Sequence, residues 1–228
     1  MLSAIAIVPS APVMVPELAA GAAEELADLR HAAITAAGTL PHRWIAVGVD
    51  RTDAVVAPHR PGTFAGYGVD VRVTLAPDVD GEPARLPLCG LITGWLRGRA
   101  DPDARAEVRV YAEDHGVDTA LARGRALRAE IDRAAEPVGV LVVADGAHTL
   151  TPSAPGGYDP DSIPVQAALD DALAAGDAAA LTRLAEGVVG RVGYQVLAGL
   201  TESNAVAASE LYRGAPYGVG YFAGVWRA

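Results

Sequence analysis

The sequence predicts an α/β protein: a single-domain, three-layer α/β sandwich with a mainly parallel central sheet and a C-terminal hairpin. The first observation is that apolar runs of strand length alternate with helix-like segments along the chain. The second is VGVLVVAD, at Val138–Asp145, whose unbroken apolar character is typical of a strand covered on both faces. The third is the pair AVAASELY and VGYFAGVW, separated by a turn rich in Pro and Gly. A length of 228 residues fits one large domain, residues 1–228.

Strands and helices are both expected in the first half of the chain. Leu2–Val8 is apolar and predicts a buried strand. The predicted helix Pro16–Ala37 opens with proline and glutamate, which both suit a first helical turn. Trp44–Val49 predicts a short strand, and the alternation in Val69–Leu75 predicts a half-exposed one. LPLCGLITGWLRG, residues 86–98, then predicts a buried helix.

The second half continues the alternation. Ala106–Ala112 alternates apolar and polar residues and predicts another strand. The segment Asp118–Arg133 predicts a helix, because an aspartate suits its start and apolar residues recur at helical spacing. Two further helices are expected at about Pro164–Ala175 and Ala178–Val189, before the hairpin.

Composition narrows the classes of function. The net charge is −10 and every basic residue is arginine; without lysine, a P-loop ATPase and Schiff-base catalysis are excluded. No dense arginine run is interleaved with aromatics, so no nucleic-acid partner is expected. Cys89 is the only cysteine, which excludes an intramolecular disulfide framework. No apolar run is long enough to span a bilayer and no secretory signal is evident, so a cytoplasmic protein without membrane contact is expected.

The richest polar stretch is ADGAHTLTPSAPGGYDPDS, which begins where the most apolar strand ends. Ligands of open α/β sheets bind at the carboxyl ends of strands. Asp145 could orient His148 as a general base, and Thr149 and Thr151 could donate hydrogen bonds to a substrate oxygen. The alternative is that Asp145 caps a turn and His148 is a loop residue on the surface. The loops 50–67 and 146–164 both exceed the usual connection length, which is typical of functional or mobile segments.

A second stretch of interest is IAIVPSAPVMVPEL, residues 5–18, where a strand, a proline-rich loop and a helix start follow one another. Ser10 is the only polar side chain inside the loop. No two histidines show the close helical spacing of zinc proteases. His59 lies in an Arg/Pro-rich loop and His31 on a helix among alanines, where solvent exposure is expected.

Together, AIVPSAPVMVPEL, VLVVADGAHTLTPSAPGGYDPDS and YRGAPYGVGYFAGVW resemble the class III extradiol dioxygenase (LigB-like) superfamily. They are most similar to a divergent actinobacterial branch of it. The resemblance covers nearly the whole chain and implies the fold predicted above. It also implies an iron(II) site of two histidines and one carboxylate, with a further histidine as acid/base, because open positions on iron must hold the substrate and O₂.

The residues at the family positions depart from that site. Ser10 stands where the first iron-ligand histidine is expected, and neutral serine is a poor iron(II) ligand. The second histidine would fall in VGVDRTD, where Asp50 or Asp53 would have to substitute beside the cationic Arg51. The carboxylate would be Glu186 or Glu202. The acid/base position is retained at His148.

Three functions follow from this resemblance and its departures. The first is a pseudoenzyme without iron that binds a small molecule, with aromatic compounds among the candidates. The second is an enzyme without a metal cofactor, in which His148 is the general base, Asp145 orients it, and Ser10 and Asp50 position a polar substrate. The third is an iron(II) enzyme with replaced ligands such as Asp50, His59 and Glu186. The apolar C-terminal hairpin offers a strand edge, so a homodimer is also expected.

Overall fold

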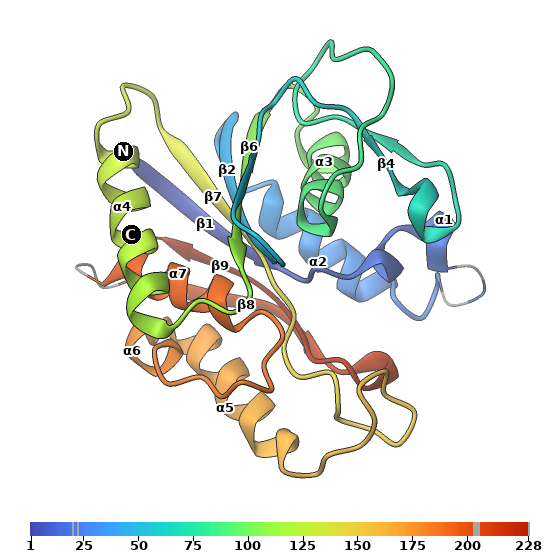
Figure 1. Cartoon of the computed structure of the whole chain (residues 1–228), viewed down its shortest axis with the longest axis vertical. Helices are drawn as coiled ribbons and strands as arrows, with labels where there is room; N and C mark the ends of the chain where they lie inside the picture. Colours follow the sequence, from blue (N-terminus) through green and yellow to red (C-terminus); the bar gives the residue numbers. More distant parts are fainter. Residues whose placement is uncertain (20, 22, 203–205, 228) are drawn as a thin grey trace.

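The computed structural model describes residues 1–19, 21, 23–202 and 206–227. In this part of the chain, seven strands form one sheet in the order β3-β6-β2-β7-β1-β9-β8 (Figure 1). They are β1 (Leu2–Val8), β2 (Arg43–Asp50), β3 (Ala54–Val56), β6 (Arg105–Ala112), β7 (Val138–Val143), β8 (Ala207–Gly214) and β9 (Tyr221–Arg227). The four central strands β6, β2, β7 and β1 are parallel, whereas β3, β9 and β8 pair in antiparallel fashion. The predicted fold class is therefore confirmed.

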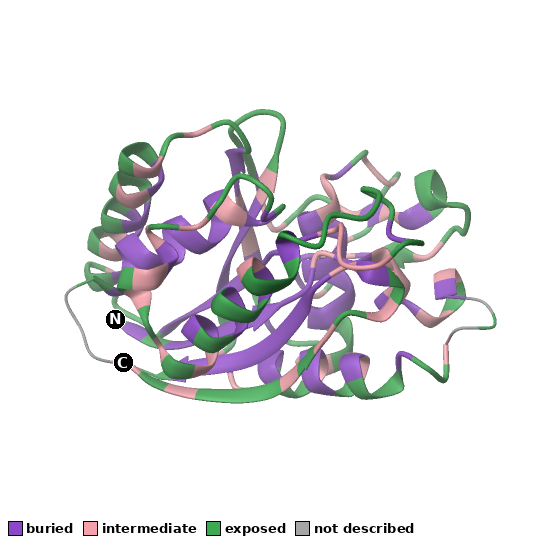
Figure 2. Ribbon diagram, turned by 90° about the horizontal axis from the view of Figure 1, so that it is seen from below, coloured by how far each residue is buried: buried purple, intermediate pink, exposed green. Residues whose placement is uncertain are grey.

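Helices cover both faces of this sheet. They are α1 (Pro16–Ala19), α2 (Ala27–Ala37), α3 (Leu88–Ala100), α4 (Val117–Asp132), α5 (Ser162–Ala175), α6 (Ala178–Leu181) and α7 (Arg191–Thr201). One cluster of buried side chains packs α2 and α3 against one face of the sheet. A second cluster packs α4, α5, α6 and α7 against the opposite face. Figure 2 shows the buried sheet between helices whose outer faces are exposed. None of the described helices has the length and apolar character that a membrane span requires.

The sequence of β7 explains why it occupies the middle of the sheet. All six of its residues are buried. Successive side chains of a strand point to opposite faces, so Val140 and Val142 join the α4–α7 cluster while Leu141 and Val143 join the α2–α3 cluster. A strand that supplies both cores must be apolar at every position.

Two predicted helices differ from those observed: one is divided and one ends early. The helix predicted at Pro16–Ala37 is divided into α1 and α2, with the helix-weakening Gly21 between them; residues 20 and 22 lie outside the described part. The helix predicted at Ala178–Val189 ends with α6, and α7 follows it without having been predicted. The signal for α7 was present, since Val192, Val196 and Leu200 recur at helical spacing and all are buried.

The strand predicted at Val69–Leu75 is also wrong in extent. Only β5 (Arg72–Val73) forms, and it pairs with β4 (Gly62–Thr63) in a separate ribbon outside the main sheet. Arg97, from α3, donates from Nε to the carbonyl of Thr74 at 2.8 Å and from Nη2 to its hydroxyl at 2.8 Å. A buried guanidinium therefore satisfies polar groups that a strand would pair with a neighbour.

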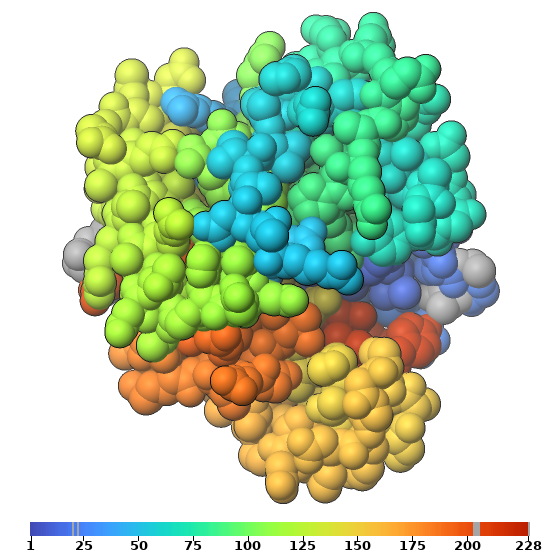
Figure 3. All heavy atoms as spheres, viewed as in Figure 1, coloured from blue at the N-terminus to red at the C-terminus, as the bar shows by residue number. Residues whose placement is uncertain are grey.

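The parallel strands end at a common edge, and this edge positions the candidate site. The strands β1, β2 and β7 are neighbours and run in the same direction, so the loops that carry Ser10, Asp50 and His148 start at the same edge, as predicted. In Figure 3 the segment before α7 and the loop 146–164 lie in the lower half of the view.

Candidate functional site

The loop after β7, residues 144–150, is called the His148 loop, and backbone hydrogen bonds fix it on two sides. The N–H of Gly146 donates to Gly220 at 2.8 Å, and the N–H of Gly220 donates to Ala147 at 2.8 Å. On the other side, the N–H of Gly190 donates to the carbonyl of Asp145 at 2.8 Å. The loop is thus hydrogen-bonded on one side to the residue before β9 and on the other side to the residue before α7.

A buried glutamine from α5 supports the same loop. Gln166 accepts the N–H of Ala147 on Oε1 at 2.8 Å and donates from Nε2 to Asp170 at 2.8 Å. A carbon atom added to Gly146 or to Gly220 would lie 2.0 Å and 2.2 Å from the Gln166 amide, so the amide occupies space that only glycines leave open. The backbone leading into His148 is therefore rigidly held.

The His148 loop borders a cavity of about 360 Å³, called the His148 cavity. It is lined by side chains and backbone from the loops after β6 and β7 and from the segment that leads into α7: Glu113, His148, Glu186, Gly187, Val188, Val189 and Arg191. The cavity lies at the carboxyl edge of the sheet, where α/β proteins commonly bind ligands.

The imidazole of His148 has an unused polar atom. Its Nδ1 is buried and has no hydrogen-bond partner among the described residues. A carbon added to Gly156 would lie 2.6 Å from Nε2, so the backbone of the loop 146–164 covers this side of the ring. A buried nitrogen without a partner is uncommon in folded proteins. Because this nitrogen has almost no accessible surface, the ring or the loop would have to shift before a ligand in the cavity could reach it.

Arg191, at the start of α7, supplies the cation of the cavity. It donates from Nη1 to the carbonyl of His115 and to Oε1 of Gln195, both at 3.2 Å, and from Nη2 to the carbonyl of Glu113 at 3.3 Å. A guanidinium has five N–H donors, so about two remain free. Among the described residues no carboxylate forms an ion pair with it. Its acceptors are neutral, and the carboxylates of Glu113 and Glu186 line the same cavity.

Asp145 does not orient His148, contrary to the prediction. Its Oδ1 accepts the N–H of Ser10 at 2.7 Å, which ties the proline-rich loop after β1 to the end of β7. Burial without a positive partner raises the pKa of this carboxyl to about 7, although the hydrogen bond from Ser10 opposes the rise. Part of the residue still reaches solvent. Asp145 is therefore an ionisable group that titrates near neutral pH at the base of the loops.

Two phenols lie close to this carboxyl. The pKa of Tyr194 and that of Tyr221 are raised above their usual value, first by burial and then by the nearby charge of Asp145. Tyr194 donates its O–H to the carbonyl of Ala144 at 2.9 Å. Both tyrosines stay protonated at neutral pH, so neither adds a charge beside Asp145.

The other predicted site residues do not gather around His148. Asp50 lies on the α3 side of the sheet, in a different cavity, and its Oδ1 accepts the N–H of Arg51 at 2.7 Å. Thr149 and Thr151 do not line the His148 cavity; Thr151 packs against Gly218. The single cleft predicted for Ser10, Asp50 and His148 is thus divided between the two faces of the sheet.

The predicted metal candidates also lie apart. Glu186 lines the His148 cavity, Asp50 lies on the α3 side, and His59 is exposed in the loop after β3. Asp53 instead accepts hydrogen bonds from His115 at 2.7 Å and Arg123 at 2.8 Å, and Glu202 pairs with Arg125. Within the described ranges no three His, Cys, Asp or Glu side chains come close enough to hold a metal ion. These residues do not fit the iron site that the resemblance implies.

The cavity residues Glu113 and Arg191 were not predicted from the sequence. Glu113 follows directly after β6, so its position at the carboxyl edge could have been inferred once that strand was recognised as parallel. Arg191 stands at the start of α7, which was itself missed.

Comparisons with known proteins support the fold. No protein-family model matches the sequence, and no curated protein sequence is significantly similar to it. Among solved structures, the chain is similar to the uncharacterized protein JW3007 from Escherichia coli K12, with a TM-score of 0.62 and 12% sequence identity. The match covers 99% of this chain and 100% of that chain. At this identity the likeness shows that the two chains share an α/β fold.

Proposed function

We propose that this protein binds a small organic molecule in the His148 cavity and that it is a LigB-like pseudoenzyme without an iron centre. The observation that carries the proposal is His148 itself. It lines the cavity at the carboxyl edge of a parallel sheet, on a loop that is hydrogen-bonded on both sides, and its buried Nδ1 has no partner among the described residues. Beside it, Arg191 keeps about two free N–H donors for an acceptor group of the ligand.

The relationship to the LigB-like family is supported by where the three similar stretches lie. The strand of the first, β1, pairs with β7 of the second on one side and with β9 of the third on the other. Their loops also meet, because Ser10 donates to Asp145 and Gly146 donates to Gly220. The sequence signal for the family is thus concentrated in one place, around the His148 loop.

A second candidate function is acid/base catalysis without a metal, and the observation that favours it is Asp145. A carboxyl whose pKa is about 7 exchanges its proton near neutral pH, which suits a general acid or base. In this alternative Asp145 and His148 act as separate groups, since no hydrogen bond joins them.

Binding is tested with two probes, catechol and 3,4-dihydroxybenzoate, titrated into the full chain. We expect saturation-transfer NMR to detect 3,4-dihydroxybenzoate with wild-type protein and to lose the signal with His148→Ala. The matched control is His31→Ala, because His31 is exposed on α2, away from the cavity. Equal binding by wild type and His148→Ala would contradict the proposed site.

Catalysis is tested with the same samples. The pseudoenzyme proposal predicts that both probes remain chemically unchanged over hours, and that protein prepared anaerobically with iron(II) retains less than one equivalent. Ring-opened yellow product with stoichiometric iron would favour a dioxygenase instead. Conversion of a probe without metal, abolished in His148→Ala, would favour the acid/base enzyme.

A further inference from the structure

A larger cavity, of about 980 Å³, lies on the other face of the sheet and is called the α3 cavity. Its walls come from the loop after β2, the segment 83–87 and the first turn of α3. Leu86, Leu88 and Leu91 supply an apolar wall, next to two prolines. Pockets that take small organic ligands measure about 300–1,000 Å³, so the size of this cavity fits, and its lining combines the leucine wall with polar groups.

The charge of the α3 cavity is positive although the protein is strongly acidic. Arg51 and Arg85 line it, and neither forms an ion pair with a described residue. Asp50 is the only carboxylate in the lining, and one of its oxygens is engaged by the backbone N–H of Arg51. Two guanidiniums thus face one partly satisfied carboxylate.

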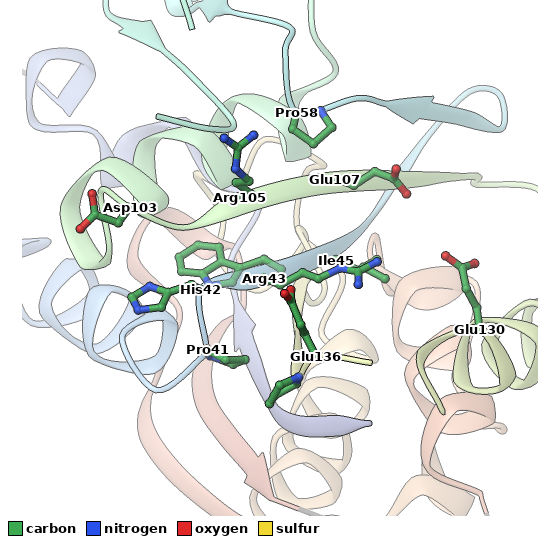
Figure 4. A pocket seen from close by; sticks show the side chains of 12 residues that line it. Pro41, His42, Arg43, Ile45, Pro58, Asp103, Arg105, Glu107, Glu130 and Glu136 are labelled. Carbon is green, nitrogen blue, oxygen red and sulfur yellow. The ribbon is translucent and has the colours of Figure 1, made fainter. Parts of the chain in front are cut away.

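A third cavity, of about 860 Å³ at the amino edge of the sheet, provides a comparison. It also contains two arginines without a described ion pair, Arg43 and Arg105 (Figure 4). Its lining carries four carboxylates as well: Asp103, Glu107, Glu130 and Glu136. Positive charge is therefore opposed at the amino edge but is in excess in the α3 cavity.

A neutral side chain and the backbone of the α3 cavity also favour a negatively charged ligand. Burial and the charge of Asp50 raise the pKa of the Tyr67 phenol while Arg85 lowers it, and the net rise keeps Tyr67 a donor at neutral pH. The first turn of α3 has no acidic residue and no side chain caps it. The partial positive charge of this helix start therefore adds to the two guanidiniums.

We propose that the α3 cavity binds the oxyanion of an organic ligand, a phosphate or a carboxylate carried on an apolar body. Arg51 and Arg85 hold the anion, Tyr67 donates to it, and the leucine wall receives the apolar part. The site lies on the opposite face from the His148 cavity and does not depend on the function proposed there.

The test uses three probes with the same ring: phenyl phosphate, benzoate and phenol, titrated calorimetrically into the full chain at low salt. We expect at least one of the two anions to bind about tenfold or more tightly than phenol. Preference for phenyl phosphate identifies the anion as phosphate, and preference for benzoate identifies it as carboxylate. Added salt should weaken the binding, because both arginines are exposed.

Four variants locate the site. Arg51→Gln and Arg85→Gln should each weaken binding of the preferred anion about tenfold or more, because each removes one charge-assisted contact. Arg227→Gln changes the net charge equally at the end of β9 and should leave the affinity unchanged, as should Arg105→Gln in the cavity at the amino edge. The proposal is overturned if phenol binds as tightly as the anions, or if no anion binds at millimolar concentration. It is also overturned if Arg105→Gln or Arg227→Gln weakens binding as much as Arg85→Gln.

Discussion

Asp145→Asn should stabilise the protein above neutral pH, and the structure gives the size of the effect. The pKa of Asp145 is about 7 in the folded protein, against 3.8 for an ordinary aspartate. The difference is roughly 3 pKa units, and each unit corresponds to about 1.36 kcal/mol, so ionising Asp145 costs the folded state about 4 kcal/mol. Asparagine keeps the acceptor for the Ser10 N–H but carries no charge.

The sign follows from proton binding. The folded state holds the Asp145 proton more tightly than the unfolded state, so this group's contribution to stability is fully present below about pH 4. That contribution is lost as the pH rises toward 7 and stays lost above it. Asp145→Asn has no proton to lose at this position, so its stability does not fall for this reason as the pH rises. The difference in unfolding free energy between variant and wild type should therefore be near zero at pH 4 and about 4 kcal/mol at pH 8.

Urea unfolding of both proteins from pH 4 to pH 8 measures this difference. The other titrating groups, including the buried Asp170 whose pKa is raised to about 6, cancel in the comparison. Asp80→Asn is the matched control, because it removes the same charge from an exposed position. A flat profile for Asp145→Asn, or a variant less stable than wild type at pH 8, would refute the burial of an unpaired carboxyl.

Two further perturbations test the framework around the site. Gly124→Ala should destabilise the protein by about 1–3 kcal/mol in urea unfolding, since the added carbon would lie 2.2 Å from the carbonyl oxygen of Val196. The control Gly98→Ala should instead stabilise the protein by about 0.5–1 kcal/mol, because a carbon added there meets no heavy atom within 4 Å. Gln166→Leu should cost about 1–3 kcal/mol and speed hydrogen exchange at Ala147, whose buried N–H loses its acceptor. Gly124→Ala as stable as wild type, or unchanged exchange at Ala147, would contradict these contacts.

Much of the fold could be predicted because each central strand carries its own signal. The residues of β7 are apolar at every position, and the alternation of such runs with helices leaves a parallel sheet as the simple arrangement. The convergence of the loops after β1 and β7 followed from this arrangement, and the hydrogen bond from Ser10 to Asp145 realises it. Local pattern and global topology agree here, which is why the prediction succeeded.

The separation of Asp50 and His148 onto two faces of the sheet could not be predicted, because it depends on the face toward which each loop turns after its strand ends. Asp50 ends β2 and lies on the α3 side, whereas His148 lies five residues beyond β7 and is carried to the other side. That turn is set by the hydrogen bonds of Gly220, Gly190 and Gln166 to the His148 loop. All three come from elements distant in sequence, so no local pattern reports them.

Asp145 also separates the two functions proposed for the His148 cavity. Its hydrogen bond with Ser10 does not require an aspartate, because asparagine offers the same acceptor oxygen. The aspartate differs in having a proton that it exchanges near neutral pH, and it retains this property at a cost of about 4 kcal/mol, a large part of the roughly 5–15 kcal/mol of a typical domain. If the protein only binds its ligand, Asp145→Asn should be more stable and bind 3,4-dihydroxybenzoate with unchanged affinity at pH 8. If Asp145 transfers a proton, the variant should be equally stabilised and still bind the probe, but lose its conversion. A variant that is stabilised yet no longer binds would contradict both, because Asp145 does not line the His148 cavity.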